Sequence, residues 1–352
     1  MSFLRSECAK PWTSAACVCI LEAEISCGRK HFDEQRQVKR MAEFTITLNI
    51  LLPVFLQMGL GQLLRRVGWL PIDLARRINR LIFRFFLPIL VFNNMRGMSG
   101  GSGLDGSYAV FVFIAMTAVF AVAMLFVRRL EKDPLKRGVI VQGIFRANLA
   151  VLGIPLMQGM YGTLGAEMIA VTLPLVLPIN NVLSVVALSA WSKAQPRPRD
   201  ILKSIMTNPL ILACVAGGVF MLTGWQLPAL LDKVATQVGN VATPLALIVL
   251  GASLEWKGLR DSRRELFWTV LLRQAVIPAI MVTAAYFLGF RGVYLGVIVV
   301  LFGAPNAVSS YPMADAMGCD GTLAASMVVL TTVFSMGTLF ALIYVGKLLA
   351  VL

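Results

Sequence analysis

The residues best suited to bind a ligand are neutral amides, hydroxyls and an arginine that lie inside long apolar stretches. Arg146 and Asn148 stand two residues apart in one stretch, while Asn306, Ser309 and Ser310 stand together in another. An amide offers hydrogen-bond donors and an acceptor without charge, and a charged residue within a membrane segment indicates function by default. We therefore interpret these residues as a binding site for an organic anion. Snorkelling of Arg146 to the surface and helix packing by the amides are the alternatives.

Prolines and a glycine interrupt the same two stretches. Gly153 and Pro155 follow Asn148, and Pro305 and Pro312 flank the second polar cluster. Proline has no N–H and leaves the carbonyl four residues before it without its helical partner. Such groups are tolerated in a membrane only within protein or beside a water-filled cavity. We predict that Gly153, Pro155 and Pro305 form part of the site where two broken helices meet. A plain proline kink is the alternative.

A third polar patch, with Asn240 and Thr243 before Pro244, is added to the substrate-binding set. Packing and function are both kept open for four further amides, which are Asn93, Asn94, Asn180 and Asn181. For a second intramembrane arginine, Arg273, function and snorkelling to the surface are both kept open.

The elements that must position these residues are membrane-spanning helices. Of the 352 residues, 58% are hydrophobic and 14% are charged, whereas soluble domains carry about 25% charged residues. The apolar runs are solid blocks long enough to cross a bilayer, which predicts an all-α polytopic membrane protein. Ten helices are expected, at 43–64, 74–95, 108–128, 138–161, 165–191, 209–224, 230–254, 265–288, 292–317 and 322–350.

An internal repeat relates the fourth of these helices to the ninth. Residues 145–163 and 302–320, offset by 157, are identical at six of nineteen positions, including Pro155 and Pro312. Five helices per half is an odd number, so the halves must insert in opposite orientations, as in many transporters. The prediction is two inverted five-helix repeats with broken, crossing fourth and ninth helices. The domains are 41–192 and 208–352, joined by a short cytoplasmic linker at 193–207.

Basic residues concentrate in alternate connections, within 65–80, 128–137, 193–203 and 257–264. Positive loops stay in the cytoplasm, so both ends of the ten-helix core are expected on the outer side of the plasma (inner) membrane. Residues 1–40 would then carry their own basic residues outward. We therefore expect this N-terminal extension to be non-native or disordered, with Met41 as the true first residue.

Several functions are disfavoured by residue usage. The one histidine, His31, precedes the first span, and the six cysteines have no metal-ligand spacing. No cofactor, metal or catalytic residue is expected, and the chain has no His-Glu-x-x-His motif, so it is not expected to be an enzyme. The net charge of +14 is scattered over short loops, which argues against nucleic acid. The expected partners are a small carboxylate and the lipid bilayer, and a homodimer is kept as a hypothesis.

The chain resembles the auxin efflux carrier family of secondary transporters, particularly its prokaryotic, malate or malonate transporter-like members. The resemblance is carried by residues 52–56, 145–155, 208–211, 239–254 and 304–314. It implies ten helices in two inverted repeats, and transport of carboxylated molecules. By position it also implies that Pro155 and Pro305 are the crossover prolines, with Asn148 and Asn306 as polar crossover residues. The long cytoplasmic loop of many plant members is reduced here, which argues against plant-type auxin transport.

The predicted function is secondary transport of small organic anions, such as malate or malonate, by alternating access. The alternatives are a cation/proton antiporter of similar fold and a non-transporting membrane receptor. An antiporter is expected to need carboxylates at the crossover, but Asp315 is the only clear acidic residue within the spans, and it lies toward a helix end.

Overall fold

The structure is a computed structural model that describes residues 52–98, 105–191, 198–349 and 352. The chain divides into two units, 1–46 and 47–352, and only the second contains described residues. The proposed extension, 1–40, and the expected start at Met41 lie outside the described part of the chain. Within that part the protein is helical and contains no β-strand.

Every one of the ten predicted stretches contains helix in its described residues. Residues 52–66 form the first helix. The first half continues with α2 (Ile72–Leu81), the π-helical turn η1 (Ile82–Phe86), α3 (Leu87–Arg96), α4 (Gly106–Leu130), α5 (Pro134–Phe145) and α6 (Leu149–Ala190). The second half contains α7 (Pro198–Thr207), α8 (Pro209–Thr223), α9 (Ala229–Ser253), α10 (Trp256–Asp261), α11 (Arg263–Leu271), η2 (Leu272–Val276), α12 (Ile277–Phe287), α13 (Val293–Gly303), α14 (Ser310–Ala316) and α15 (Gly321–Leu348).

Five helices in the described part are long and apolar enough to cross a membrane, or up to six if the bent pair α7 and α8 is one span. The shorter α5, α13 and α14 adjoin breaks, which is why their lengths fall below that of a full span. The long α6 also contains a break, since Gly162 has a non-helical φ of 64° between two predicted helices. The chain is therefore a multi-pass membrane protein.

Side-chain caps fix where several helices begin. The side chains of Asp105, Asp133, Asn208 and Asp320 each accept a hydrogen bond from a backbone N–H in the first turn of α4, α5, α8 and α15. Such caps satisfy N–H groups that have no partner within the helix. Pro134 and Pro209 occupy first helical positions, where the missing N–H costs nothing.

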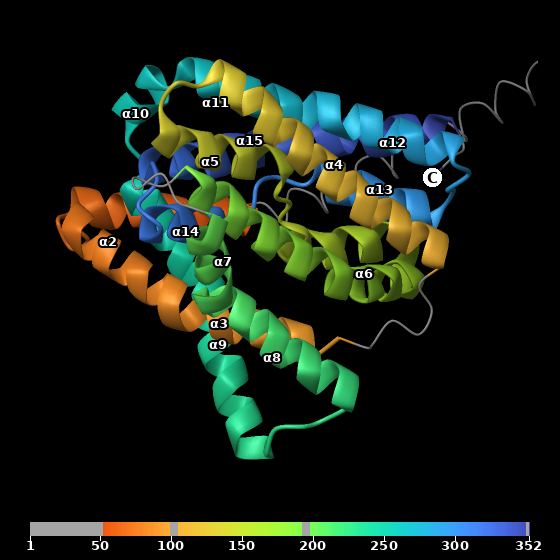
Figure 1. Ribbon diagram of the computed structural model, residues 1–352, viewed down its shortest axis with the longest axis horizontal. Helices are drawn as coiled ribbons and strands as arrows, with labels where there is room; N and C mark the ends of the chain where they lie inside the picture. Colours follow the sequence, from red (N-terminus) through yellow and green to blue (C-terminus); the bar gives the residue numbers. More distant parts are fainter. Residues whose placement is uncertain (1–51, 99–104, 192–197, 350–351) are drawn as a thin grey trace, which may run out of the picture. The chain divides into compact units, whose positions relative to one another are not determined.

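Two packed groups of helices are visible in Figure 1. In one, α3 packs against α8 and α9, and α2 also packs against α9. In the other, α6 packs against α5 and α13, α4 against α5, and α12 against α13. The helix at 52–66 approaches α9 closely, because a Cβ on Gly251 would lie 2.0 Å from the Met58 carbonyl oxygen. Glycine is needed at this position for the two backbones to pack.

Polar contacts at α14 join the two groups. The Asn79 amide of α2 donates to the Asp315 carboxylate of α14 at 2.7 Å. The Tyr311 hydroxyl of α14 donates to Ser253 Oγ of α9 at 2.6 Å. Because α14 also packs against α5 of the second group, sliding of α14 with that group past α2 and α9 must break both contacts.

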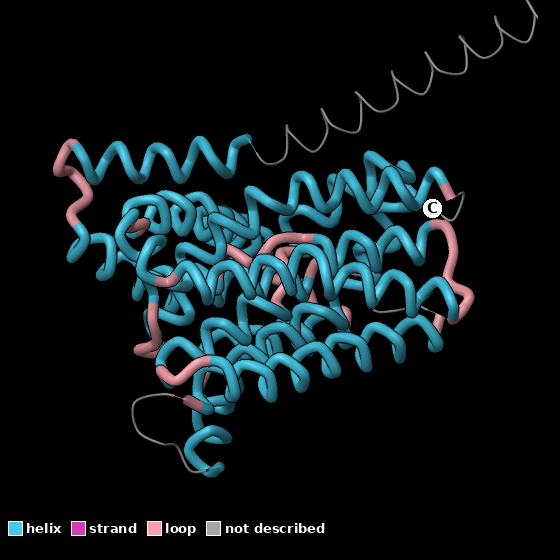
Figure 2. The backbone as a smooth tube through the Cα atoms, turned by 90° about the horizontal axis from the view of Figure 1, so that it is seen from above, coloured by secondary structure: helices cyan, strands magenta, loops and turns pink. Residues whose placement is uncertain are grey.

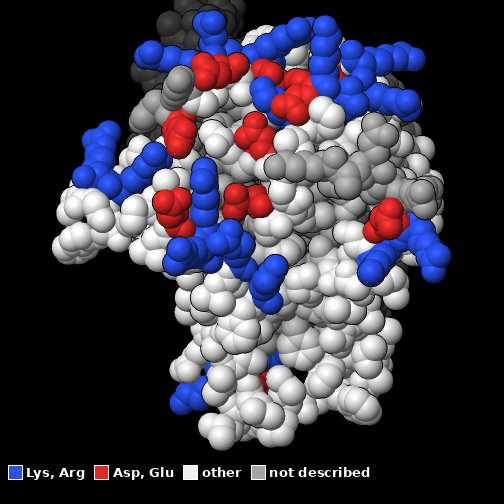
Figure 3. Space-filling model, turned by 60° about the vertical axis from the view of Figure 1, so that its left-hand side comes forward, with Lys and Arg blue, Asp and Glu red and all other residues white. Residues whose placement is uncertain are grey.

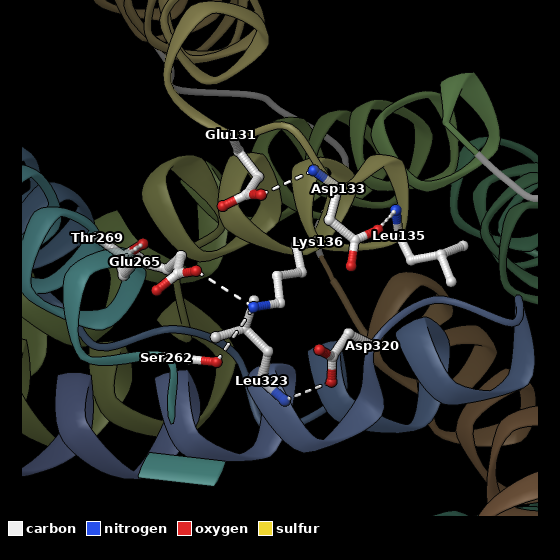
Figure 4. A network of polar contacts seen from close by, with 9 residues as sticks. All are labelled: Glu131, Asp133, Leu135, Lys136, Ser262, Glu265, Thr269, Asp320 and Leu323. Carbon is white, nitrogen blue, oxygen red and sulfur yellow. Dashed lines mark hydrogen bonds and ion pairs between the residues drawn. The ribbon is translucent and has the colours of Figure 1, made fainter. Parts of the chain in front are cut away.

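Charged side chains cluster at one end of the helices. Figure 3 shows many Lys and Arg side chains, with Asp and Glu among them, above a region with few charges. Large apolar side chains such as Phe287 and Leu222 are exposed on helices, as expected for surfaces that contact lipid. Within the charged end, Lys136 of α5 lies 3.2 Å from Glu265 of α11 (Figure 4). Burial opposes the charge on Lys136, but the Glu265 carboxylate raises the pKa of Lys136 above its usual value.

Candidate functional site

The two predicted helix interruptions contact each other. Between α5 and α6, and between α13 and α14, the chain leaves the helical conformation, and Figure 2 shows loop segments within the bundle as well as at its ends. Ala147 and Asn306 form an isolated antiparallel β-bridge. The Asn148 N–H donates to the Pro305 carbonyl at 2.9 Å. Positions matched by the 157-residue offset, Asn148 and Pro305, are therefore paired in space.

The first break is not at Pro155, which is a correction to the sequence prediction. Pro155 lies inside α6, nine residues after Arg146, where the break begins. The helix is interrupted where the Asn148 N–H bonds to Pro305 across the contact instead of to Ile144 within its own helix. Pairing between the two segments, rather than a missing proline N–H, explains the position of this break. Pro305, in contrast, lies within its own break.

The fully buried Arg273 satisfies carbonyls at the ends of both broken helices. Its guanidinium donates to Ala304 O at 2.7 Å and also to the Ile144, Phe145 and Leu301 carbonyls. The Leu301 carbonyl is the group that Pro305 frees. A positive charge is favourable at helix C-termini, and α5 and α13 both end here. Arg273 is therefore occupied by backbone groups and does not snorkel to the surface, since its side chain is fully buried.

A cavity of about 80 Å³ adjoins the crossing. It is lined by the crossing segments, by α6, and by residues of α3, α8 and α9 from the other helix group. Its lining residues are Leu87, Leu90, Val91, Asn94, Arg146, Ala147, Asn148, Ala150, Val151, Leu177, Asn180, Asn181, Leu210, Thr243, Ala246, Ala307, Val308 and Ser309. One of them, Arg146, is charged.

Arg146 is held in this cavity by uncharged groups. Its Nη2 donates to Asn181 Oδ1 at 3.0 Å and to Ser309 Oγ at 2.8 Å, and Nη1 contacts the Met313 sulfur at 3.1 Å. The residue is 4% exposed, and among the described residues no carboxylate lies within ion-pair distance of it. A buried charge normally requires an opposite charge, so this guanidinium is suited to bind an anion from outside the protein.

The structure brings four of the ten predicted site residues together around the cavity, namely Arg146, Asn148, Thr243 and Ser309. The other six lie elsewhere. Asn306 and Ser310 are buried beside the crossing and hydrogen-bond to each other at 2.8 Å. Pro305 contributes the backbone carbonyl of the crossing.

The remaining three predicted residues lie on helices away from the lining. Gly153 and Pro155 lie in α6, where a Cβ on Gly153 would lie 3.0 Å from the side chains of Ile169 and Leu149. Asn240 is an exposed residue of α9.

Three amides left open from the sequence also line the cavity. Asn94 comes from α3, and Asn180 and Asn181 are adjacent residues of α6. Asn181 orients Arg146, while Asn180 Oδ1 is buried and has no hydrogen-bond donor within the described structure. Adjacent amides after a proline in an apolar stretch were the available signal, but sequence spacing could not show which face they occupy.

A family model described as "Membrane transport protein" matches residues 46–193 and 180–343. The chain belongs to the auxin efflux carrier family of membrane transport proteins. Two relatives of this carrier are similar over most of their length. An "Uncharacterized transporter" of Methanothermobacter thermautotrophicus is 26% identical over 295 residues, covering 82% of this chain and 94% of the relative. A "Putative malonate transporter" of Rhizobium meliloti is 23% identical over 325 residues, covering 86% and 96%.

Proposed function

We propose that this carrier moves small carboxylates across the membrane by alternating access. The observation that supports this most strongly is the buried guanidinium of Arg146, which faces a cavity and has no acidic partner within the described residues. The amide of Asn148, which precedes the first turn of α6, adds neutral polar groups beside it. A helix N-terminus favours negative charge, and Ala150 and Val151 of that first turn line the cavity.

The small cavity favours a small substrate. Pockets for drug-sized ligands are about 300–1,000 Å³, whereas this cavity is about 80 Å³. A three- or four-carbon acid suits this volume better than an indole acid. The Rhizobium relative, named as a putative malonate transporter, agrees in substrate class.

In the proposed movement, the helix group that contains α4, α5, α6, α12 and α13 moves against the group of α2, α3, α8 and α9. The cavity lies where the two groups meet, so sliding would open it toward one side and then the other. Such a movement fits the proposed architecture of ten helices in two inverted five-helix repeats. In that architecture both ends of the ten-helix core lie on the outer side of the inner membrane. Among the described residues that line the cavity none is a carboxylate, which favours an anion carrier over a cation/proton antiporter. Each negative charge that leaves a cell with a negative interior gains about 2.3 kcal/mol per 100 mV.

The test is flux through purified protein in liposomes with labelled malonate, malate and indole-3-acetate, with and without an imposed potential. Protein-free liposomes are the control. We expect uptake of malonate or malate to exceed the control and to respond to the potential, with indole-3-acetate transported poorly. A folded protein that binds these acids without moving them would indicate a receptor. Sodium-dependent proton flux in place of carboxylate flux would indicate an antiporter.

A further inference from the structure

A second hollow, a groove of about 440 Å³, lies between α11 and α15 and continues along η2. It shares no lining residue with the cavity beside Arg146. Of the eleven described residues that line it, eight are apolar and one, Arg263, is charged. The groove is therefore an apolar channel with a single positive charge.

The groove opens on a surface that contacts lipid. Among the five described helices long enough to cross the membrane, those that contain α11 and α15 are the least buried, with 28% and 33% of the residues buried in their most apolar stretches. Phe267 and Phe334 line the groove and are 60% and 55% exposed. Large exposed apolar surfaces of this kind mark contact with a membrane or a partner. What occupies the groove is thus met within the bilayer.

The walls of the groove are fixed to each other. Gln274 of η2 lines the groove, is 5% exposed, and donates from Nε2 to the Thr331 carbonyl of α15 at 3.2 Å. The helices α11 and α15 also pack directly against each other. The groove is therefore preformed, and a ligand does not have to separate the two helices.

The lining of α11 changes from charged to apolar with depth. Arg263, Phe267 and Leu271 line the groove at intervals of four residues, which places them on one helix face about 6 Å apart. Arg263 is exposed, and none of the described acidic side chains forms an ion pair with it. Its neighbours Ser262 and Glu265 belong to the Lys136 network at the charged end (Figure 4). A phospholipid has the same order, with an anionic phosphate above an apolar chain.

The dimensions of the groove separate a lipid chain from a helix of a second copy. The twelve residues from Arg263 to Ala275 extend about 18 Å in a helix. A volume of about 440 Å³ over this length corresponds to a cross-section of about 24 Å². A helix with its side chains is about 10 Å or more across, which is about 80 Å². An extended hydrocarbon chain fits this section, and a helix does not.

We infer that this groove binds an anionic phospholipid, with the phosphate at Arg263 and one acyl chain between α11 and α15. Basic pockets between membrane helices on the cytoplasmic side suit anionic headgroups, and the basic connection at 257–264 is expected on that side. The adjacent Arg264 has different surroundings, because it lines a separate pocket together with Glu131 and Glu265. Those two carboxylates oppose a phosphate there, so the site belongs to Arg263.

The experiment measures the melting temperature of the purified full-length protein in detergent, titrated with dioleoyl phosphatidylglycerol or dioleoyl phosphatidylcholine. The two lipids have the same chains and differ in net charge. A basic residue near an anionic lipid surface contributes about a fivefold gain in binding. We therefore expect half-maximal stabilisation at about a fivefold lower concentration of phosphatidylglycerol. Inorganic phosphate alone, which has no acyl chain, should give no stabilisation.

Two pairs of variants test the headgroup and the chain separately. Arg263→Gln should abolish the difference between the two lipids, whereas the matched control Arg264→Gln should retain it. Ala275→Trp places a large side chain in the groove and should abolish stabilisation by both lipids. Ala279→Trp, the same change at an exposed position outside the lining, should not. The melting temperature without added lipid shows that each variant is folded.

Four results would overturn the inference. The first is equal half-maximal concentrations of the two lipids in the wild-type protein. The second is an Arg264→Gln variant that loses the preference as fully as Arg263→Gln, which would indicate general attraction by the basic surface. The third is lipid stabilisation that persists in Ala275→Trp. The fourth is a dimer, detected by light scattering, that Ala275→Trp dissociates, which would show that a second copy covers the groove.

Discussion

Two buried arginines lie at the crossing, and they have different environments. Arg273 is surrounded by the carbonyls that end α5 and α13. Arg146 contacts an amide, a hydroxyl and a sulfur, and lines a cavity. Both residues are arginines, and both lie well inside a predicted membrane helix. Their neighbours, rather than their type, separate a structural arginine from a candidate ligand-binding one.

The difference also shows how the broken helices are used. Their C-terminal ends carry partial negative charge, which the protein neutralises with its own cation. The N-terminal end of α6 lies beside the cavity, where it can favour an incoming anion. At this interruption the C-terminal end of α5 is therefore bound by Arg273, while the N-terminal end of α6 remains available to a ligand.

The largest expected effect comes from Arg273→Met. Removal of the guanidinium leaves the Ile144, Phe145, Leu301 and Ala304 carbonyls without their donor, and each buried unpaired group costs about 1–3 kcal/mol. We expect the free energy of unfolding to fall by about 4 kcal/mol or more, measured by thermal unfolding in detergent. Arg273→Lys retains the charge and should recover part of the loss. Unchanged stability in the methionine variant would contradict the structural role.

Arg146→Gln should affect transport more than stability. The variant loses the charge that faces the cavity, and we expect flux to fall about 100-fold, as for a lost charge-assisted contact. Liposome uptake measures the flux, and the melting temperature shows that the fold is retained. Arg84→Gln, the same change at an exposed position, is the matched control and should have no effect. Equal loss in both variants would remove Arg146 from the site.

A smaller effect distinguishes the two crossover amides. Asn148 lines the cavity and its side chain makes no capping bond to α6, whereas Asn306 Oδ1 accepts from Ser310. Asn148→Ala should raise KM about tenfold with little change in stability. Asn306→Ala should lower stability by about 1 kcal/mol and change KM less. The reverse pattern would show that Asn306 is the residue that contacts substrate.

The smallest effect is expected at the charged end of the helices, away from the two buried arginines. Lys136→Met removes the ion pair with Glu265, whose side chains are 22% and 17% exposed. A partly exposed pair contributes about 1 kcal/mol or less, so the melting temperature should fall slightly and flux should be unchanged. Lys132→Met is the matched control, because Lys132 is exposed. A large loss of flux would show that this network takes part in the movement.

The helices were largely predictable, because solid apolar runs and proline, glycine and charge between them mark each end. The contact between the two breaks followed from the 157-residue repeat, which places Asn148 against Pro305. The position of the first break was not predictable from Pro155, because a hydrogen bond to a distant segment determines it.

The role of Arg273 and the faces of Asn180 and Asn240 also escaped prediction. Arg273 lies in the π-helical turn η2, just before Pro278. Such a turn changes the angular position of every following side chain, so helical periodicity cannot place it. Asn180 lies on the cavity and Asn240 on an exposed surface. Their orientation depends on which helix packs opposite, which sequence spacing alone does not contain.

The β-bridge between Ala147 and Asn306, with the Asn148–Pro305 hydrogen bond beside it, has one further consequence. It fastens two segments that are more than a hundred residues apart at the point where both have lost their helical bonding. Neither segment can shift along its helix axis alone without leaving backbone groups of the crossing unpaired. In the movement that we propose, the two segments therefore shift together, and a ligand bound beside Arg146 shifts with them.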